Sequence, residues 1–361
     1  MGLLTIGSFA RAARLSPKAL RLYDELGLLR PAQVDPHSGY RFYDLDQLEQ
    51  ARLVAWLRRL GMPLAQIRVV CGMPGPDAAH AVADYWSRVE VETAARRDLA
   101  AFLIDYLSGK DTAMAGAQKT LGIRYAVRSD IGMHRKLNED SAYAGARLLA
   151  VADGLGGHAG GEVASAAAID ALKPLDAEIP AGDLLNALEH AVHEANDKLQ
   201  LIAESDPSLR GLGTTLTAML WSGSQLALVH IGDSRAYLLR DGELFQITHD
   251  HTLVQTLIDE GRITPDEAAS HPQRSLLMQA LDGRSPRPDL QLREAAEGDR
   301  YLLCSDGLYA VVAMEKLREV LSDVPDPEDV VQQLVDLANS GGGPDNITCV
   351  VADVIELAGL P

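Results

Sequence analysis

The sequence predicts a multidomain chain: a small helical head, one long helix, a short linker, and a larger body built from strands and helices. A length of 361 residues corresponds to two or three domains at roughly 150 residues each. A Gly/Pro-rich breaker at 71–76 precedes residues 77–107, which contain neither Gly nor Pro. The charge also changes sign. Residues 1–75 hold ten Lys/Arg and six Asp/Glu, a net charge of +4, whereas residues 118–361 hold 19 and 38, a net charge of −19.

Composition excludes several classes of protein. Apolar residues make up 47% and charged residues 23%, which is typical of a globular chain and not of a disordered one. No apolar run reaches the roughly 18 residues of a membrane span, and the first residues lack the basic and apolar regions of an export signal. Cys71, Cys304 and Cys349 are too far apart for a disulfide framework, so we expect a cytoplasmic protein. The total charge of −18 argues against nucleic-acid binding, but this average hides the basic head.

The head begins with a predicted helix-turn-helix. Ser16 can cap a helix and Pro17 is tolerated at the first helical position, so a helix is expected there. An earlier short helix, joined to it by residues 13–15, completes the motif. In this geometry Lys18 and Arg21 can enter a DNA major groove.

A tight turn at 35–39 follows. Arg30, Tyr40 and Arg41 flank this turn and can reach backbone phosphates. The alternative is a small helical domain whose arginines are merely solvated. Spacing alone favours neither interpretation, because helix-turn-helix pairs also occur in proteins that never touch DNA.

Residues 77–107 are expected to form one helix with a coiled-coil seam. Seam positions alternate at steps of four and three residues, the spacing at which two helices pair. They are Val82, Trp86, Val89, Thr93, Ala100, Leu103 and Leu107, with Arg96 completing the register. Residues 108–117 are small or polar and are interpreted as a linker.

Several short segments of the head occur together. They are 5–7, 20–24, 26–29, 40–43 and 60–64, with Ser16 and Ile67. Across residues 3–70 this set resembles the winged DNA-binding domain of MerR-type bacterial regulators. The resemblance implies a winged helix-turn-helix over 1–71 and a homodimer formed through the helix 77–107. The DNA-facing positions would be Ser16, Lys18, Arg21, Tyr23, Tyr40 and Arg41. Cys71 stands alone, so a metal-sensing role is not expected.

Several aspartates of the body stand at the ends of apolar strands. They are Asp140, Asp153, Asp233, Asp306 and Asp345. Carboxylates held together at buried strand ends repel one another and lose solvation, and a divalent cation removes this cost. Oxygen ligands without His or Cys nearby favour Mg²⁺ or Mn²⁺ over zinc. A glycine after the aspartate, as in Asp153-Gly154, lets backbone approach the ion. The alternative is a set of ordinary strand-end turns, which is how Asp241-Gly242 is best read.

Two such cations suit hydrolysis of a phosphate ester, because they activate water and stabilise charge on the transferred group. Arg135, five residues before Asp140, is a candidate phosphate clamp, with a simple surface arginine as the alternative. The glycine-rich run 153–162 matches neither the P-loop nor the dinucleotide fingerprint, so nucleotide binding is not expected.

A second set of segments occurs in order along the body. They are 135–141, 153–162, 213–215, 232–235, 248–251, 271–272, 304–308 and 344–348. Across residues 120–354 this set is similar to the bacterial branch of the metal-dependent protein phosphatases of type 2C. The resemblance implies an α+β domain over 118–357 with four layers in the order α/β/β/α. It also implies hydrolysis of phosphoserine and phosphothreonine in proteins at a dinuclear Mn²⁺ or Mg²⁺ centre.

The same resemblance assigns roles to residues. Asp153 would bridge the two ions and Arg135 would bind the phosphate, which makes them the catalytic residues. Some family members place a histidine after the Asp-Gly pair as a general acid, but Leu155 stands here, and the role is not transferred to His158. Residues 248–285 correspond to the mobile flap that shapes substrate access. The ligands would be Asp306 and Asp345 for one ion, Glu139 and Asp140 for the other, Asp153 and the carbonyl of Gly154 at the centre, and Asp233 for a weaker third ion.

The sequence thus predicts a protein serine/threonine phosphatase joined to a DNA-binding head, acting in bacterial signalling or transcriptional regulation. Its expected partners are phosphorylated proteins, a cognate Ser/Thr kinase and double-stranded DNA. The alternative is a transcription regulator whose body only senses or docks. Such a body would have lost at least one of Asp140, Asp153, Asp306 and Asp345. A two-metal nuclease lacks motif support, and the acidic body would repel a second nucleic-acid strand.

Overall fold

The computed structural model describes residues 2–107, 121–155 and 160–357. They form two compact units, which are described separately. The first contains Met1–Val89 together with Leu253–Leu276, and the second contains Glu90–Thr252 together with Leu277–Pro361. The predicted linker 108–117 and His158 lie outside the described residues. No helix in the described part of the chain is long and apolar enough to cross a bilayer.

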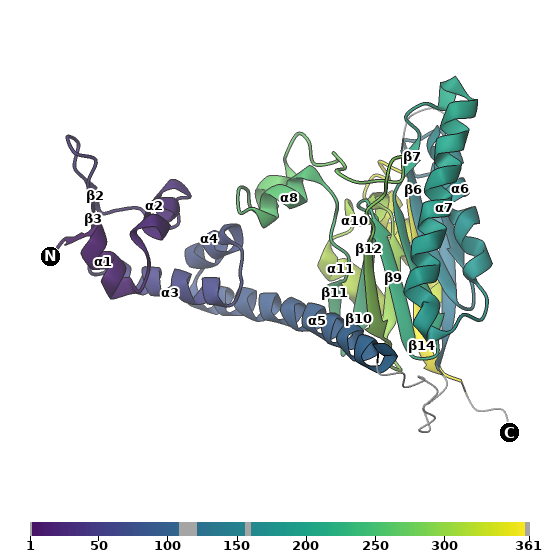
Figure 1. Ribbon diagram of the computed structural model, residues 1–361, viewed down its shortest axis with the longest axis horizontal. Coiled ribbons are helices and arrows are strands. Elements are labelled where there is room, and N and C mark those ends of the chain that lie inside the picture. Colours follow the sequence, from purple (N-terminus) through teal and green to yellow (C-terminus); the bar gives the residue numbers. More distant parts are fainter. Residues whose placement is uncertain (1, 108–120, 156–159, 358–361) are drawn as a thin grey trace. The chain divides into compact units, whose positions relative to one another are not determined.

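Short helices and a small sheet build the head of the first unit (Figure 1). Phe9 stacks on Tyr43 with ring centroids 4.6 Å apart, and Leu20, Leu29 and Ile67 are buried in the same core. The sheet has the strand order β1-β3-β2. The elements are β1 (Leu4–Thr5), α1 (Ile6–Ala13), α2 (Pro17–Glu25), β2 (Gln33–Val34), β3 (Arg41–Tyr43), α3 (Gln47–Arg59), α4 (Leu64–Gly72) and the start of α5 (Gly75–Leu107).

The turn between α1 and α2 follows from local chemistry. Arg14 adopts the left-handed conformation, with φ of 55°, and ends α1. Ser16 Oγ accepts a hydrogen bond from the Ala19 N–H at 3.0 Å, and Pro17 occupies the first helical position. The helix start expected at Ser16 is therefore present, and α2 runs to Glu25.

The helix α5 is continuous from Gly75 to Leu107, and so includes the predicted helix 77–107. Its first turns pack on the core of the head through Ala78, Ala81, Val82 and Tyr85. Val82, which the seam prediction placed against a partner helix, thus contacts the core of its own head. The beginning of α5 stabilises the head directly, and the pairing of two such helices stays a prediction.

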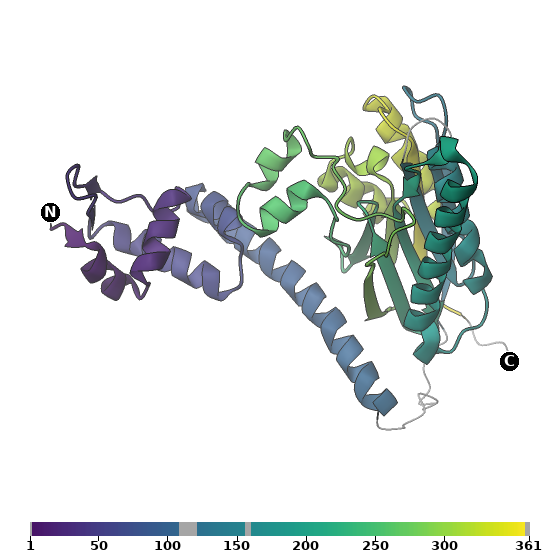
Figure 2. The ribbon, with the colours of Figure 1, turned by 45° about the horizontal axis from the view of Figure 1, so that its top comes forward.

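Two antiparallel sheets form the second unit (Figures 1 and 2). One has the order β11-β10-β13-β14-β4, and the other has the order β12-β9-β8-β6-β5, with β7 paired to β6. The strands are β4 (Leu121–Asp130), β5 (Asp140–Ala144), β6 (Leu148–Leu155), β7 (Gly213–Thr214), β8 (Leu216–Ser222), β9 (Gln225–Ile231), β10 (Arg235–Arg240), β11 (Glu243–Gln246), β12 (Asp289–Glu294), β13 (Arg300–Cys304) and β14 (Ile347–Glu356). The helices are α6 (Gly160–Leu172), α7 (Leu184–Ser205), α10 (Asp306–Tyr309), α11 (Met314–Asp323) and α12 (Pro327–Ser340).

Apolar side chains cover both faces of these sheets. Alternate residues of β6 point to opposite sides: Leu148 packs with α6 and α7, whereas Leu149 packs against the other sheet. Between the sheets, Trp221 and Tyr301 meet edge to face with ring centroids 5.4 Å apart. Leu302 faces α11 and α12. A strand buried on both faces needs apolar residues at every position, which explains the continuous apolar runs of the sequence.

Candidate metal centre

The predicted aspartates stand where strands of the two sheets end. Asp140 opens β5 directly opposite Asp153 in β6. Asp306 starts α10 just after β13, and Asp345 stands two residues before β14, the strand that pairs with β13. Asp233 lies in the turn between β9 and β10. The structure therefore places these residues together at strand ends of the second unit.

Burial and mutual repulsion perturb these carboxyl groups. Burial, followed by the charges of Asp140 and Asp306, raises the pKa of Asp153 well above its ordinary value. Burial raises the pKa of Asp140 to about 6. Burial and then Asp345 raise the pKa of Asp306 to about 6. Burial and then Asp306 raise the pKa of Asp233 to about 7. A positive charge among these carboxyl groups would lower their pKa values and favour their ionised forms.

Three buried carboxylate oxygens have no hydrogen-bond partner within the described residues: Glu139 Oε1, Asp140 Oδ1 and Asp306 Oδ1. An unpaired buried oxygen of this kind is costly, so each is a candidate coordination position. The donors are all oxygens, which fits Mg²⁺ or Mn²⁺. Among the residues that the structure describes, no group of three or more His, Cys, Asp or Glu side chains is arranged so that it could hold a metal ion as it stands. Backbone carbonyls and water would complete the coordination of an ion held by these carboxylates.

Neutral side chains hold the carboxylates in place. Ser305 Oγ donates to Asp140 Oδ2 at 2.7 Å. Asn346 Oδ1 accepts from the Glu139 N–H at 2.8 Å, while its Nδ2 donates to two nearby backbone carbonyls. Ser305 and Asn346 are not among the site residues predicted from the sequence. The sequence feature that could have indicated them is their position next to Asp306 and Asp345.

Close backbone packing surrounds Gly154. A Cβ at this position would collide with the carbonyl oxygen of Gly161, so only glycine fits. The Gly154 N–H donates to the carbonyl oxygen of Glu139 at 3.1 Å. The preceding residue, Asp153, donates its N–H to Thr215 Oγ1 at 2.9 Å. The backbone at Gly154 thus packs closely against the backbone of Gly161 and Glu139, and the approach of the Gly154 carbonyl to an ion stays a prediction.

Arg135 lies against two acidic residues of the group. Its Nη2 is 2.6 Å from Asp345 Oδ2, and its Nη1 is 3.6 Å from Glu139 Oε2. The Arg135 side chain is 45% exposed, so part of its guanidinium remains accessible. A guanidinium beside a carboxylate cluster suits the binding of phosphate oxygens.

A buried ion pair supports the turn at Asp233. Arg235 Nη2 lies 2.6 Å from Asp250 Oδ2, and its Nε contacts the same carboxylate. The Arg235 guanidinium also lies 3.7 Å from the ring centroid of Tyr309. The Tyr309 hydroxyl donates to the backbone carbonyl of Asp233 at 3.0 Å. This chain of contacts fixes the backbone on which Asp233 stands.

In the head, the structure separates the predicted DNA-facing residues into two groups. Ser16, Lys18, Arg21 and Tyr40 are exposed. Tyr23 is only 5% exposed and belongs to the core, which differs from its expected place facing DNA, because its ring completes the apolar cluster of the head. Arg41 Nε lies 2.6 Å from Asp24 Oδ2, so an acidic neighbour already pairs with its guanidinium through this nitrogen.

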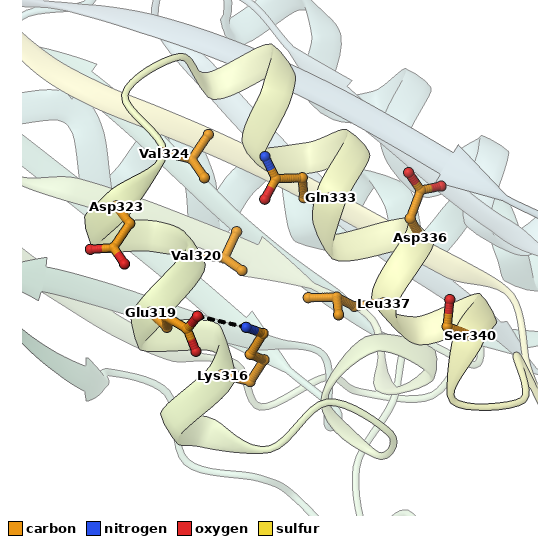
Figure 3. A pocket seen from close by; sticks show the side chains of 9 residues that line it. All are labelled: Lys316, Glu319, Val320, Asp323, Val324, Gln333, Asp336, Leu337 and Ser340. Atoms are coloured by element: carbon orange, nitrogen blue, oxygen red, sulfur yellow. Dashed lines mark hydrogen bonds and ion pairs between the residues drawn. The ribbon is translucent and has the colours of Figure 1, made fainter.

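A pocket of about 330 Å³ lies between α11 and α12 (Figure 3). Val320, Val324 and Leu337 form its apolar part, and Lys316 is paired with Glu319 at its edge. None of the residues lining this pocket is a predicted site residue. The carboxylate cluster therefore remains the candidate centre.

Comparison with protein-family models matches residues 135–347 to protein phosphatase 2C. The chain belongs to the protein phosphatase 2C family. A second model, the MerR helix-turn-helix family of regulatory proteins, matches residues 4–73. Both resemblances inferred from the sequence are confirmed. The chain combines a helical N-terminal region of MerR type with a β-rich domain of the 2C phosphatase fold.

Named relatives agree with the family. The serine/threonine protein phosphatase PstP of Mycobacterium tuberculosis is 60% identical over 240 residues, which cover 66% of this chain and 46% of PstP. This chain thus spans about half the length of PstP. The serine/threonine phosphatase stp of Listeria monocytogenes is 36% identical over 237 residues, 63% of this chain and 94% of stp.

Solved structures show the same fold. The crystal structure of the Mycobacterium tuberculosis phosphatase PstP/Ppp has a TM-score of 0.64 and 59% identity, covering 65% of this chain and 100% of that one. The PstP catalytic domain in complex with two manganese ions has a TM-score of 0.62 and 58% identity, covering 65% of this chain and 100% of that one.

Proposed function

We propose that this chain is a metal-dependent protein serine/threonine phosphatase joined to a DNA-binding head. The observation that carries the proposal is the buried, oxygen-only carboxylate cluster with unpaired oxygens, in a chain of the 2C family. The names of PstP and stp support the activity, and the two manganese ions of one PstP structure support the cofactor. In detail, we propose a winged helix-turn-helix over 1–71, a dimerisation helix over 77–107, a linker over 108–117 and a four-layer α/β/β/α domain over 118–357.

The residues of the cluster have different roles in the proposed hydrolysis of phosphoserine or phosphothreonine. When bound, two Mn²⁺ or Mg²⁺ ions supply Lewis acidity and neutralise charge. Arg135 donates to the phosphate oxygens and so orients the ester. Leu155 stands after the Asp-Gly pair, so the leaving group takes its proton from water and not from a side chain at that position. The residues proposed to hold the ions are Glu139, Asp140, Asp153, Gly154, Asp306 and Asp345, with Asp233 for a third ion.

We propose that the head binds double-stranded DNA as a homodimer. Lys18 and Arg21 are exposed on α2, the second helix of the helix-turn-helix, and Tyr40 is exposed beside β3. The net charge of +4 over residues 1–75 favours a phosphate backbone. The partners would be phosphorylated proteins, their cognate Ser/Thr kinase and operator DNA in the bacterial cytoplasm.

A regulator whose body only senses or docks is the second candidate. The presence of Asp140, Asp153, Asp306 and Asp345 disfavours it, because a body without catalysis has no need to keep all four acidic residues. Buried charge of this kind destabilises a fold unless it is used.

The test uses the purified full chain with a phosphopeptide and an aryl phosphate. We expect turnover that requires Mn²⁺, that a chelator abolishes, and that Asp306→Ala removes. Asp197→Ala, on the exposed side of α7, is the matched control and should keep its activity. Full turnover by Asp306→Ala would overturn the assignment. A shift assay with the chain's own promoter DNA tests the head, and no shift at low salt would count against DNA binding.

A further inference from the structure

The segment Leu253–Leu276 belongs to the phosphatase part of the sequence but packs with the head. In the sequence it lies between β11 and β12, and it carries α8 (Leu253–Asp259) and α9 (Pro265–Ala269). In the structure it forms one compact unit with Met1–Val89. It falls within 248–285, the stretch that resembles the flap of 2C phosphatases.

The helix α4 is the part of the head that this segment contacts. Arg68 Nη2 lies 2.8 Å from Glu267 Oε2, although the two residues are 199 positions apart. Gly261 passes so close to the start of α4 that a Cβ would lie 3.2 Å from Leu64 Cβ and 3.5 Å from Ala65 N. Its φ of +71° also requires glycine. An ion pair and a close backbone approach thus join the segment to α4.

Local structure positions Glu267 for this ion pair. Thr264 and Glu267 form a capping box at the start of α9. The Thr264 N–H donates to Glu267 Oε2 at 2.7 Å, and the Glu267 N–H donates to Thr264 Oγ1 at 3.2 Å. The backbone hydrogen bond from Thr264 is the main reason that the pKa of Glu267 lies below its ordinary value. The carboxylate is therefore charged and already oriented when it meets Arg68.

The base of the segment is bonded to the turn that carries Asp233. Thr252 and Leu277, which flank the segment, pair in an antiparallel bridge. The neighbouring His251 donates its N–H to the carbonyl oxygen of Gly232 at 2.7 Å. Gly232 directly precedes Asp233. The residues at the base of the segment are therefore hydrogen-bonded to the turn that carries Asp233, so a displacement of the segment can be transmitted to this residue of the candidate metal centre.

We propose that α4 is a docking surface for Leu253–Leu276, and that the head controls through this contact how protein substrates reach the phosphatase centre. The second part of this inference rests on the proposed function. An exposed ion pair changes an equilibrium by only a small factor, about two- to fivefold. The contact is therefore weak enough to open and close, which is what a regulatory contact requires.

The first test measures amide hydrogen exchange of Leu253–Leu276 in the full chain, without substrate. Arg68→Ala should accelerate exchange there about two- to fivefold. Glu267→Gln should do the same, because Gln keeps the capping box but removes the charge. The double variant should exchange no faster than either single variant, since both remove one interaction. Arg59→Ala, an exposed arginine of α3, is the matched control. Additive effects, or an equal effect of Arg59→Ala, would overturn the docking.

The second test compares a phosphopeptide with a small aryl phosphate. Arg68→Ala should change KM for the phosphopeptide about two- to fivefold and leave kcat for the aryl phosphate unchanged. Unchanged phosphopeptide kinetics would overturn the control of substrate entry. A wild-type chain without any turnover would instead contradict the proposed function, and the exchange experiment would still decide whether α4 docks the segment.

Discussion

Replacing Asp306 by Asn should stabilise the metal-free protein while it removes the response to Mn²⁺. Burial and the charge of Asp345 raise the pKa of Asp306 from 3.8 to about 6, and one of its oxygens has no partner among the described residues. Between these two pH values the folded protein binds more protons than the unfolded chain, so the free energy of unfolding falls as the pH rises from 3.8 to about 6. Above that range the loss is complete, and Asn avoids it because it is uncharged.

The magnitude follows from the same shift. At about 1.36 kcal/mol per pH unit, the difference corresponds to at most about 3 kcal/mol. The neighbouring carboxylates share the repulsion, so we expect a gain of about 1–3 kcal/mol at pH 7.5. For a domain of this size, 1 kcal/mol moves Tm by about 2–4 °C. The metal-free Asp306→Asn variant should therefore melt about 2–12 °C above the wild type.

Thermal unfolding followed by circular dichroism, with a chelator and then with Mn²⁺, checks this prediction. Mn²⁺ should raise Tm of the wild type but hardly that of Asp306→Asn, and the advantage of the variant should shrink at pH 5.5. Asp197→Asn, an exposed residue of α7, controls for the loss of one negative charge. A variant that melts below the wild type in chelator, or that gains as much from Mn²⁺, would refute the role of Asp306 as a strained ligand.

Three further predictions concern the phosphate, the pH and the DNA. Arg135→Ala should lower kcat/KM for a phosphopeptide about 10- to 100-fold, the effect of losing a charged hydrogen bond, and unchanged kcat/KM would exclude a phosphate clamp. Because burial raises the pKa of Asp233 to about 7, protons compete with cations there, so Mn²⁺ uptake measured by calorimetry should weaken from pH 8 to pH 6. A flat profile would show that Asp233 takes no part. Lys18→Ala and Arg21→Ala should each reduce the salt dependence of DNA binding by about one unit of slope, and an unchanged slope would remove them from the interface.

The predictable features are those fixed by neighbours in the sequence. Ser16 caps α2 because the capping bond spans three residues, and this could be read directly from the chain. Asp140 and Asp153 meet because β5 and β6 follow one another and pair as a hairpin. The strand ends carry Asp-Gly pairs, so the oxygen-rich nature of the site was also visible. These conclusions need only local geometry and the pairing of adjacent strands.

Features that depend on tertiary packing could not be read in the same way. Tyr23 lies on the same helix as two residues predicted to face DNA, and only the packing of the head shows that its ring points into the core. Val82 fits a coiled-coil seam as well as it fits the core of the head, because both select the same spacing. Asn346 and Ser305 act through hydrogen bonds to distant segments, and their residue types alone do not indicate which backbone groups they will meet.

Some basic residues of the head are already paired with acidic residues of this chain, so only the others are available to bind DNA. Residues 1–75 have a net charge of +4, but Arg41 is paired with Asp24 and Arg68 with Glu267. The basic residues left exposed on α2 are Lys18 and Arg21. They lie toward the N-terminal end of α2, the end of a recognition helix that enters the DNA major groove. If the head binds DNA as proposed, it uses different positive charges for DNA and for the segment Leu253–Leu276. DNA would then not have to displace Glu267 from Arg68, so the head would bind DNA with the segment docked or released. The difference in DNA affinity between these two states would set the strength of any coupling.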